Sequence, residues 1–230
     1  TEIKKTPATT KVLGEPNNEA KFVLNFWGIS KPDVLGELAA ETPVVIVDNN
    51  NPDELPENIN QCEIQEIIDH HKWVGGLATK DIVNITARPL GCTATLMIEL
   101  MGSKAADQMP YSLRGLALSC ILSDTVAFKS LTTTEQDRKV AENLAMGIGI
   151  DIESYANQMF QAKSIISGRS DSSLIAEDSK DYVINDTKFR VSLLETQMPE
   201  AVLSHKAGLK KAISDTIASS GIDQILLFVI

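Results

Sequence analysis

The sequence predicts an α/β protein: a parallel-sheet domain with helices on both faces, followed by a smaller α/β domain. Two apolar runs, TPVVIVD (42–48) and CEIQEIIDHH (62–71), are typical of buried parallel strands, and helical patterns follow them. The small and polar residues of SIISGRSDS (164–172) then interrupt the alternation, as a linker does. We therefore predict one domain over residues 1–165 and a second over 166–230.

The N-terminal part of the first domain predicts three short elements. Residues 8–13 have the pattern of a short strand that ends at a glycine. Asn17 or Asn18 is suited to cap a helix that continues to residue 26. Proline favours the first position of a helix, so we expect a further helix over residues 32–40.

The rest of the first domain is predicted to be one more strand and a series of helices. DIVNITA (81–87) is the third strand of the sheet. Thr132 and Glu135 match a capping box in front of one of the helices. The predicted helices cover residues 92–101, 111–124, 134–146 and 152–163.

The pattern changes after the linker. Two β runs surround Asn185 and Asp186 in KDYVINDTKFRVSLLE (180–195), which predicts a hairpin. A long helix over residues 199–219 follows and ends before a glycine, and ILLFVI (225–230) reads as a last buried strand. His205 lies on that helix, and we expect it to be a surface residue.

Composition excludes some classes of partner. The net charge is −10 and the pI about 4.8, which argues against a nucleic-acid-binding surface and against an anionic membrane surface. No apolar run is long enough to span a bilayer, and no signal-peptide pattern opens the sequence. The three cysteines are scattered and odd in number, so we expect reduced thiols and a cytoplasmic protein.

Candidate site residues gather where predicted strands end. Asp48 ends one strand, and Asp69, His70 and His71 end the next, so the two groups should meet at one edge of the sheet. Asp124 ends an apolar helical run. Taken singly, each has an ordinary structural explanation, such as a turn or a helix cap. Together Asp48, His70 and Asp124 offer two oxygens and a nitrogen, which suit Mn²⁺, Mg²⁺, Co²⁺ or Zn²⁺.

Four stretches carry a family resemblance: VVIVDNN (44–50), Asp69-His70-His71, ARPLGCTAT (87–95) and LSCILSDTVAFKSLTTTEQD (118–137). In this order and spacing they resemble the DHH-family phosphoesterases, and specifically the manganese-dependent (family II) inorganic pyrophosphatases. The resemblance implies a DHH metal-binding catalytic domain followed by a DHHA2-like substrate-binding domain. It covers most of the chain and is looser after residue 170.

The resemblance also implies a role for each matched residue. Asp48 corresponds to the carboxylate that bridges two metal ions, and it is thereby part of the catalytic machinery. His70 and Asp124 correspond to ligands of the second ion. His71 corresponds to the imidazole that contacts the phosphate or the leaving oxygen, and Asp69 to a group that orients its neighbours.

Two positions depart from the family pattern. Arg169 stands where the family has a phosphate-binding lysine, and an arginine can bind phosphate through two parallel hydrogen bonds. Asn49 stands where the family has a histidine, and it can still donate a hydrogen bond to substrate. Neither the family's N-terminal His-x-x-x-Asp-x-Asp motif nor its C-terminal Ser-Arg-Lys clamp has a match in residues 1–230, so we expect a natural chain that is longer at both ends.

The function implied by the resemblance is hydrolysis of inorganic pyrophosphate to two phosphates by a two-metal-activated hydroxide between two domains. The expected cofactor is Mn²⁺ or Co²⁺, two per site, with Mg²⁺ on the substrate. An exopolyphosphatase, another DHH phosphodiesterase and a non-catalytic DHH-like protein stay open as alternatives. We expect no nucleic-acid and no membrane partner, and the strand at 81–87 is the candidate edge for a homodimer.

Overall fold

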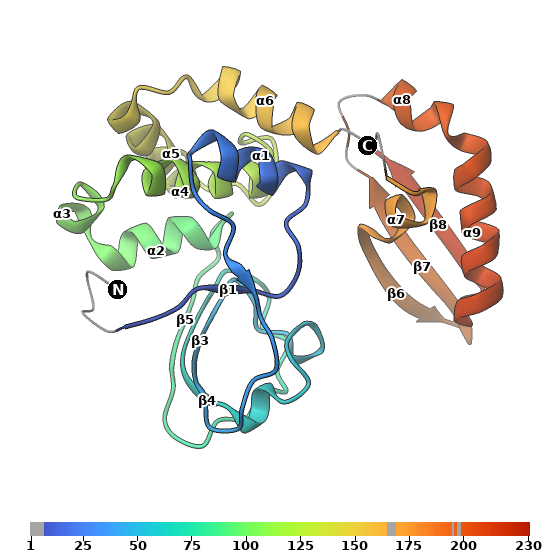
Figure 1. Ribbon diagram of the computed structural model, residues 1–230, viewed down its shortest axis with the longest axis horizontal. Helices are drawn as coiled ribbons and strands as arrows, with labels where there is room; N and C mark the ends of the chain where they lie inside the picture. The colour runs from blue at the N-terminus through green and yellow to red at the C-terminus, as the bar shows by residue number, and fades with distance from the viewer. Residues whose placement is uncertain (1–6, 165–168, 195, 197–198) are drawn as a thin grey trace. The chain divides into compact units, whose positions relative to one another are not determined.

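The computed structural model describes residues 7–164, 169–194, 196 and 199–230, which are drawn in Figure 1. The chain divides into two compact units, Thr1–Ala156 (unit 1) and Asn157–Ile230 (unit 2). Residues 165–168 of the predicted linker lie outside the described residues. No described helix is both long enough and apolar enough to cross a bilayer.

Unit 1 contains the predicted parallel sheet. Its strands are β3 (Pro43–Val47), β4 (Glu63–Asp69) and β5 (Asn84–Ala87), in the order β3-β4-β5. All three are parallel, and the register aligns Ile46 with Ile67 and Ile67 with Ile85. The prediction of three parallel strands is therefore confirmed.

The two faces of this sheet are covered to different extents. On one face Ile46, Ile59, Ile64 and Ile67 form a buried cluster, and the side chains that pack on it include Leu55. The described members of this cluster outside the sheet belong to loops and to the 3₁₀ turn Ile59–Gln61, and not to an α-helix. On β3 the opposite face is open, with Val45 50% and Val47 43% exposed.

The helices of unit 1 agree closely with the predicted ranges. They are α2 (Thr93–Met101), α4 (Tyr111–Asp124), α5 (Glu135–Ile148) and the start of α6 (Ile152–Lys163). A short helix, α3 (Ser103–Ala106), was not predicted. The predicted capping box, Thr132 with Glu135, is wrong by two residues. Thr134, which is extended, caps α5, and Asp137 is its partner, because the helix begins only after Thr134.

The N-terminal elements confirm one prediction and correct another. Helix α1 (Asn18–Phe26) is capped by Asn17, as predicted. The helix predicted over 32–40 does not form; instead β2 (Asp33–Val34) pairs in parallel with β1 (Lys11–Val12). A β-branched residue at 34 and a glycine at 36 are weak helix formers, and the pairing with β1 wins.

A buried aromatic cluster fixes α4, the helix that carries Asp124. The indole Nε1 of Trp27 donates to Ser119 Oγ at 3.1 Å and to Tyr155 Oη at 2.7 Å. Gly115 of α4 lies against the indole so closely that a Cβ there would stand 2.2 Å from Trp27. The C-terminal end of α4 is therefore held on a rigid support.

Unit 2 is a second, smaller α/β arrangement. Strands β6 (Asp178–Ile184) and β7 (Thr187–Leu194) form the predicted hairpin, and β8 (Gln224–Val229) pairs with β7 in parallel. Asn185 and Asp186 both have positive φ, as a type I′ turn requires. The predicted long helix is two helices, α8 (Pro199–Ser204) and α9 (Lys206–Ser220), which meet at His205.

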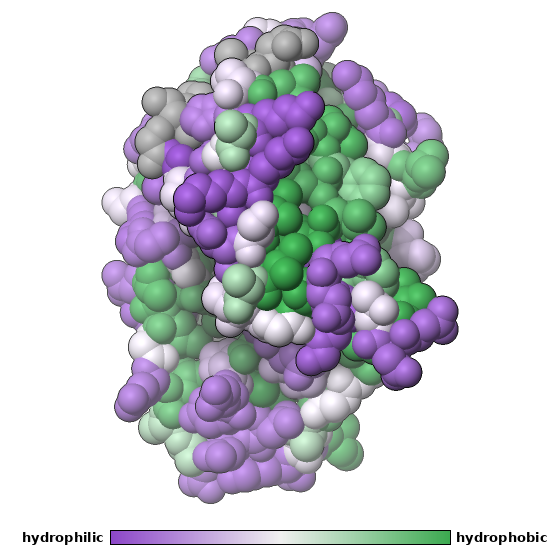
Figure 2. Space-filling model, turned by 90° about the vertical axis from the view of Figure 1, so that its right-hand side faces the viewer, coloured by the Kyte–Doolittle hydropathy of each residue, from purple (hydrophilic) through white to green (hydrophobic). Residues whose placement is uncertain are grey.

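One face of the unit 2 sheet forms the core. Leu194 of β7 packs there with Leu174 and Ile175 of α7 (Asp171–Ala176), a helix that the sequence patterns did not predict, and with Leu209 of α9. Strand β8, which the sequence predicted to be buried, is exposed on the face of the sheet opposite the core. Leu226, Tyr182 and Phe228 are between 44 and 49% exposed there, and hydrophobic surface of this kind is visible in Figure 2.

His205 is 44% exposed at its side chain, in agreement with its prediction as a surface residue. Its Nδ1 lies 3.2 Å from Asp171 Oδ1.

Candidate metal centre

The sheet of unit 1 delivers acid and imidazole groups to one edge. Asp48 follows β3, and Asp69 ends β4, its neighbour in the sheet. Asp48 has a φ of 65°, in the left-handed region, while its N–H still donates to Ile68 O at 2.9 Å. The chain therefore turns sharply at Asp48, and His70 and His71 follow β4 at the same edge.

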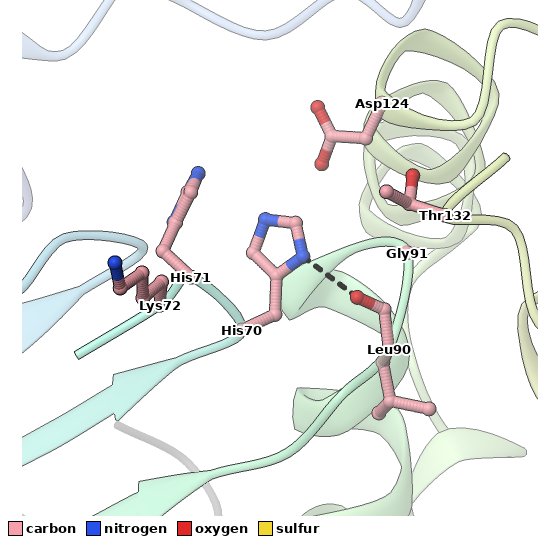
Figure 3. A pocket seen from close by; sticks show the side chains of 7 residues that line it. All are labelled: His70, His71, Lys72, Leu90, Gly91, Asp124 and Thr132. Atoms are coloured by element: carbon pink, nitrogen blue, oxygen red, sulfur yellow. Dashed lines mark hydrogen bonds between the residues drawn. The ribbon is translucent and has the colours of Figure 1, made fainter. Parts of the chain in front are cut away.

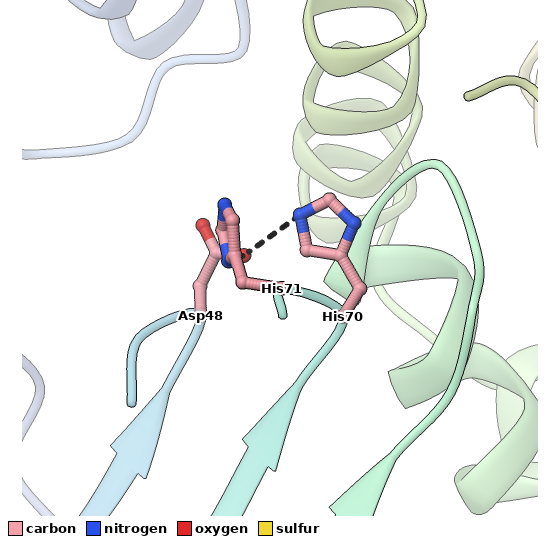
Figure 4. A group of neighbouring side chains, drawn as sticks. All are labelled: Asp48, His70 and His71. Atoms are coloured by element: carbon pink, nitrogen blue, oxygen red, sulfur yellow. Dashed lines mark ion pairs between the residues drawn. The ribbon is translucent and has the colours of Figure 1, made fainter. Parts of the chain in front are cut away.

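Asp48, His70 and His71 form a compact group (Figure 4). Asp48 Oδ1 lies 3.6 Å from His70 Nε2 and 4.0 Å from His71 Nδ1. One ligand atom from each of the three residues lies within 4.8 Å of the other two. Such a spacing allows the three side chains to share one divalent ion, at bond lengths of about 2.0–2.2 Å.

The hydrogen bond of His70 fixes its tautomer. Its Nδ1 lies 2.9 Å from the carbonyl oxygen of Leu90, which can only accept, so Nδ1 carries the proton. The lone pair is then on Nε2, the nitrogen that faces Asp48. This is the arrangement found at metal-binding histidines, whose second nitrogen is held by a carbonyl or carboxylate.

Asp69 is fully buried and accepts from several donors. Its Oδ1 accepts from the backbone N–H of His70 at 2.7 Å and of His71 at 3.1 Å, and it lies 2.8 Å from His71 Nδ1. Its Oδ2 accepts from the amide of Asn50. Burial by itself raises the pKa of Asp69, but hydrogen bonds from Asn50 and His71 outweigh it and hold the pKa below its usual value.

This lowered pKa predicts a pH dependence of stability. A carboxyl with a lowered folded-state pKa stabilises the fold above its unfolded pKa of about 3.9, and the stabilisation is lost as pH falls through the folded pKa. We expect Asp69→Asn to lower the free energy of unfolding by about 1–3 kcal/mol at neutral pH. The difference from wild type should shrink below a pH of about 4 in thermal melts. A difference that does not change with pH would contradict this assignment.

Asp124 lies in the wall of the same hollow. A pocket of about 400 Å³ is lined by His70, His71, Lys72, Leu90, Gly91, Asp124 and Thr132 (Figure 3). Asp124 lies outside the compact group defined above, yet its carboxylate points into the pocket. Asp124 as a whole residue is exposed, but the surrounding protein atoms partly desolvate its carboxyl group. This desolvation and the nearby Asp48 raise the pKa of Asp124, although a hydrogen bond from Cys92 opposes them.

The thiols are poor candidates for ligands at this site. Cys62, Cys92 and Cys120 are all free. Burial raises the pKa of the Cys92 thiol, and the negative charge of Asp124 raises it further. A thiol binds metal as the thiolate, so Cys92 stays a neutral donor to Asp124.

Two predicted substrate-binding residues have partners within their own part of the chain. Asn49 uses both polar groups of its side chain within its own loop: Oδ1 accepts from Asn51 N at 2.7 Å and Nδ2 donates to Glu54 at 3.3 Å. Arg169 belongs to unit 2, where it forms an ion pair with Glu177 at 2.9 Å. Substrate contacts by either residue stay predictions.

Several residues of the site were not singled out from the sequence. Asn50 connects the loop after β3 with the loop after β4. Its amide nitrogen donates to Asp69, and its Oδ1 accepts from Val74 N at 2.8 Å. Thr93 Oγ1 donates to Asp48 Oδ1 at 2.6 Å, and Lys72 places a cation in the pocket wall. The available signal was position: Thr93 lies in the ARPLGCTAT stretch, and Lys72 directly follows the two histidines.

The fold and the site define an α/β protein with two units and a strand-end site suited to a divalent ion. Residues 5–123 match the DHH family, N-terminal domain, and residues 157–230 match the DHHA2 domain. The chain belongs to the DHH family.

The chain is also similar to individual proteins that are named as inorganic pyrophosphatases or assigned to them. The chain is 33% identical to the "Probable manganese-dependent inorganic pyrophosphatase" of Lactobacillus gasseri, over 94% of this chain and 70% of that protein. It is 34% identical to the protein of the same name from Shouchella clausii, over 95% of this chain and 70% of that one. A crystal structure of a Methanococcus jannaschii protein assigned to the family II inorganic pyrophosphatases superimposes with a TM-score of 0.82. Its identity is 31%, over 96% of this chain and 75% of that chain.

Proposed function

We propose that this protein hydrolyses inorganic pyrophosphate to two phosphate ions in a manganese-dependent reaction. The observation that carries the proposal is the group of Asp48, His70 and His71 at the sheet edge. It occurs in a chain about a third identical, over most of its length, to proteins named manganese-dependent inorganic pyrophosphatases. Mn²⁺ is the cofactor that this similarity supports, with Co²⁺ as a chemically similar substitute.

The residues present fit a divalent ion. Carboxylate oxygens and neutral imidazole nitrogens are the donors that Mn²⁺ accepts, and His70 offers Nε2 in the required tautomer. In this proposal Asp48 would help to hold both ions, and His70 and Asp124 would hold the second of them. When bound, the ions supply an activated water that can attack phosphorus.

The chain's own residues then bind the substrate and orient it. His71 is 55% exposed at its side chain and its Nδ1–H is held by Asp69, so its Nε2 donates to a phosphate oxygen only when both ring nitrogens are protonated, as imidazolium. Lys72 lines the same pocket and adds a positive charge. Arg169 and Asn49 are further proposed substrate contacts, and each would have to leave a present partner, Glu177 for Arg169 and Glu54 for Asn49.

The substrate class can be tested directly. We expect Mn²⁺-dependent phosphate release from pyrophosphate that is much faster than release from tripolyphosphate or a phosphodiester. Asp48→Asn keeps the shape of the side chain and removes its charge, and it should abolish the release. A preference for tripolyphosphate would support the exopolyphosphatase alternative. Metal binding without any hydrolysis would support the non-catalytic one.

Two further properties belong to this proposal. Strand β5 is the edge of its sheet, and Ile82 and Ile85 nearby are 104% and 46% exposed, which favours pairing with a second copy there. A monomeric mass in sedimentation at micromolar concentration would exclude this homodimer. The free thiols at Cys62, Cys92 and Cys120 favour a reducing compartment such as the cytoplasm.

A further inference from the structure

Asp137 is a buried carboxylate with more partners than helix capping requires. It is the N3 residue of α5 and is 0% exposed. Its Oδ2 accepts from Thr134 N at 2.8 Å and from Thr134 Oγ1 at 2.6 Å, which completes the cap. It also accepts from Gly91 N at 2.8 Å and from Thr95 Oγ1 at 2.6 Å. These last two bonds hold a different part of the chain.

That part, residues 90–95, is the segment that touches the candidate metal centre. The carbonyl of Leu90 accepts from His70 Nδ1 at 2.9 Å. The hydroxyl of Thr93 donates to Asp48 Oδ1 at 2.6 Å. Gly91 adjoins the first of these contacts, and Thr95 lies beyond the second in the first turns of α2. Asp137 therefore holds the 90–95 segment at Gly91, directly after Leu90, and at Thr95, two residues after Thr93.

The close approach of this segment to Asp137 depends on Gly91. A Cβ at position 91 would lie 2.8 Å from Asp137 Oδ2 and 3.0 Å from Thr125 Cγ2. Any larger residue would push the segment away from the carboxylate. The hydrogen bond between this segment and Asp137 therefore requires a glycine at position 91.

We propose that Asp137 is a positioning residue that, through residues 90–95, fixes the orientation of His70 and Asp48 for metal binding. The inference rests on the proposed metal site. Asp137 touches neither substrate nor metal. Asp137 keeps the Leu90 carbonyl in the position from which this carbonyl selects the Nδ1–H tautomer of His70. It also keeps Thr93 in the position from which the threonine hydroxyl orients the Asp48 carboxylate. Loss of such an outer partner typically weakens metal binding by about 10–100-fold.

The bonds of Asp137 can be separated by substitution. Thr134→Ala removes only the side-chain part of the cap and leaves Gly91 and Thr95 bonded to Asp137. Thr95→Val removes only a bond to the 90–95 segment. Asp137→Asn affects both. Val140→Ala, on the buried face of the same helix, is a control for general loss of stability.

Two measurements on the 230-residue protein test the proposal. The first is long-range ¹⁵N–¹H NMR of the metal-free protein, which reports the tautomer of His70. The second is Mn²⁺ affinity by calorimetry. We expect wild type, Thr134→Ala and Val140→Ala to show the Nδ1–H tautomer and similar affinities, even where the melting temperature falls. Asp137→Asn and Thr95→Val should show mixed tautomers and an affinity about 10–100-fold lower.

Other outcomes would overturn the proposal. Equal losses of affinity in Thr134→Ala and Asp137→Asn would make the role of Asp137 purely structural, and so would an unchanged His70 tautomer in Asp137→Asn. If Asp137→Asn does not fold, Thr95→Val decides alone by the same two readouts. Wild-type protein that binds no Mn²⁺ would instead contradict the proposed function, while the tautomer data would still report on Asp137.

Discussion

His70→Ala is expected to weaken Mn²⁺ binding by roughly 100-fold or more, because loss of an outer partner alone already costs about 10–100-fold. The lone pair of His70 Nε2 faces Asp48 at 3.6 Å, and the ring is only 13% exposed, so few waters can replace it. Calorimetric titration with Mn²⁺ measures the affinity. Pyrophosphate hydrolysis by the variant should recover in part when Mn²⁺ is raised.

His71→Ala is the matched variant for this prediction. Its ring is bound to Asp69 and is 55% exposed, so we expect a smaller change in Mn²⁺ affinity. Turnover at saturating Mn²⁺ should instead fall by about 10²–10⁴-fold, the usual effect of losing a group that acts on the reacting atoms. Equal losses of Mn²⁺ affinity in the two variants would show that His71 is itself a ligand, as its place in the compact group allows.

Asp124→Asn should separate function from stability. The protein environment raises the pKa of Asp124, which means that the ionised carboxylate is disfavoured in the metal-free fold. A neutral amide of the same shape should therefore leave the melting temperature of the metal-free protein unchanged or slightly higher. Mn²⁺ affinity should nevertheless fall by roughly 100-fold, because a proposed ligand is lost.

The control for Asp124→Asn is Asp53→Asn, an exposed acid in the loop after β3 that changes the net charge equally. It should leave both the Mn²⁺ affinity and the melting temperature unchanged. If Asp124→Asn lowers the melting temperature of the metal-free protein by several degrees, Asp124 supports the fold and the assignment as a ligand loses its basis. Mn²⁺ affinity equal to wild type would contradict the assignment directly.

The sequence by itself determined the elements whose signals are local. TPVVIVD and EIIDHH are apolar runs followed by polar residues, so their strand ends, and with them the position of Asp48 beside His70, could be placed from the pattern. The hairpin at Asn185 and Asp186 was equally clear, because few residues accept the positive φ that such a turn needs. In α4 and α5, apolar residues recur along more than ten residues, which favours a helix over a strand.

Tertiary structure alone decided the rest, because the deciding contacts join residues far apart in the sequence. The segment after Pro32 could have been helical by its local signal, but pairing with β1 made it a strand. Alternation predicts that His70 and His71 face different ways, yet the chain bends at His71 and both rings lie beside Asp48. The tautomer of His70 depends on a backbone carbonyl 20 residues away, and Asp137 reaches Gly91 across 46. A carbonyl and a buried carboxylate leave no periodic mark in a sequence, so only the packed fold shows which donors they serve.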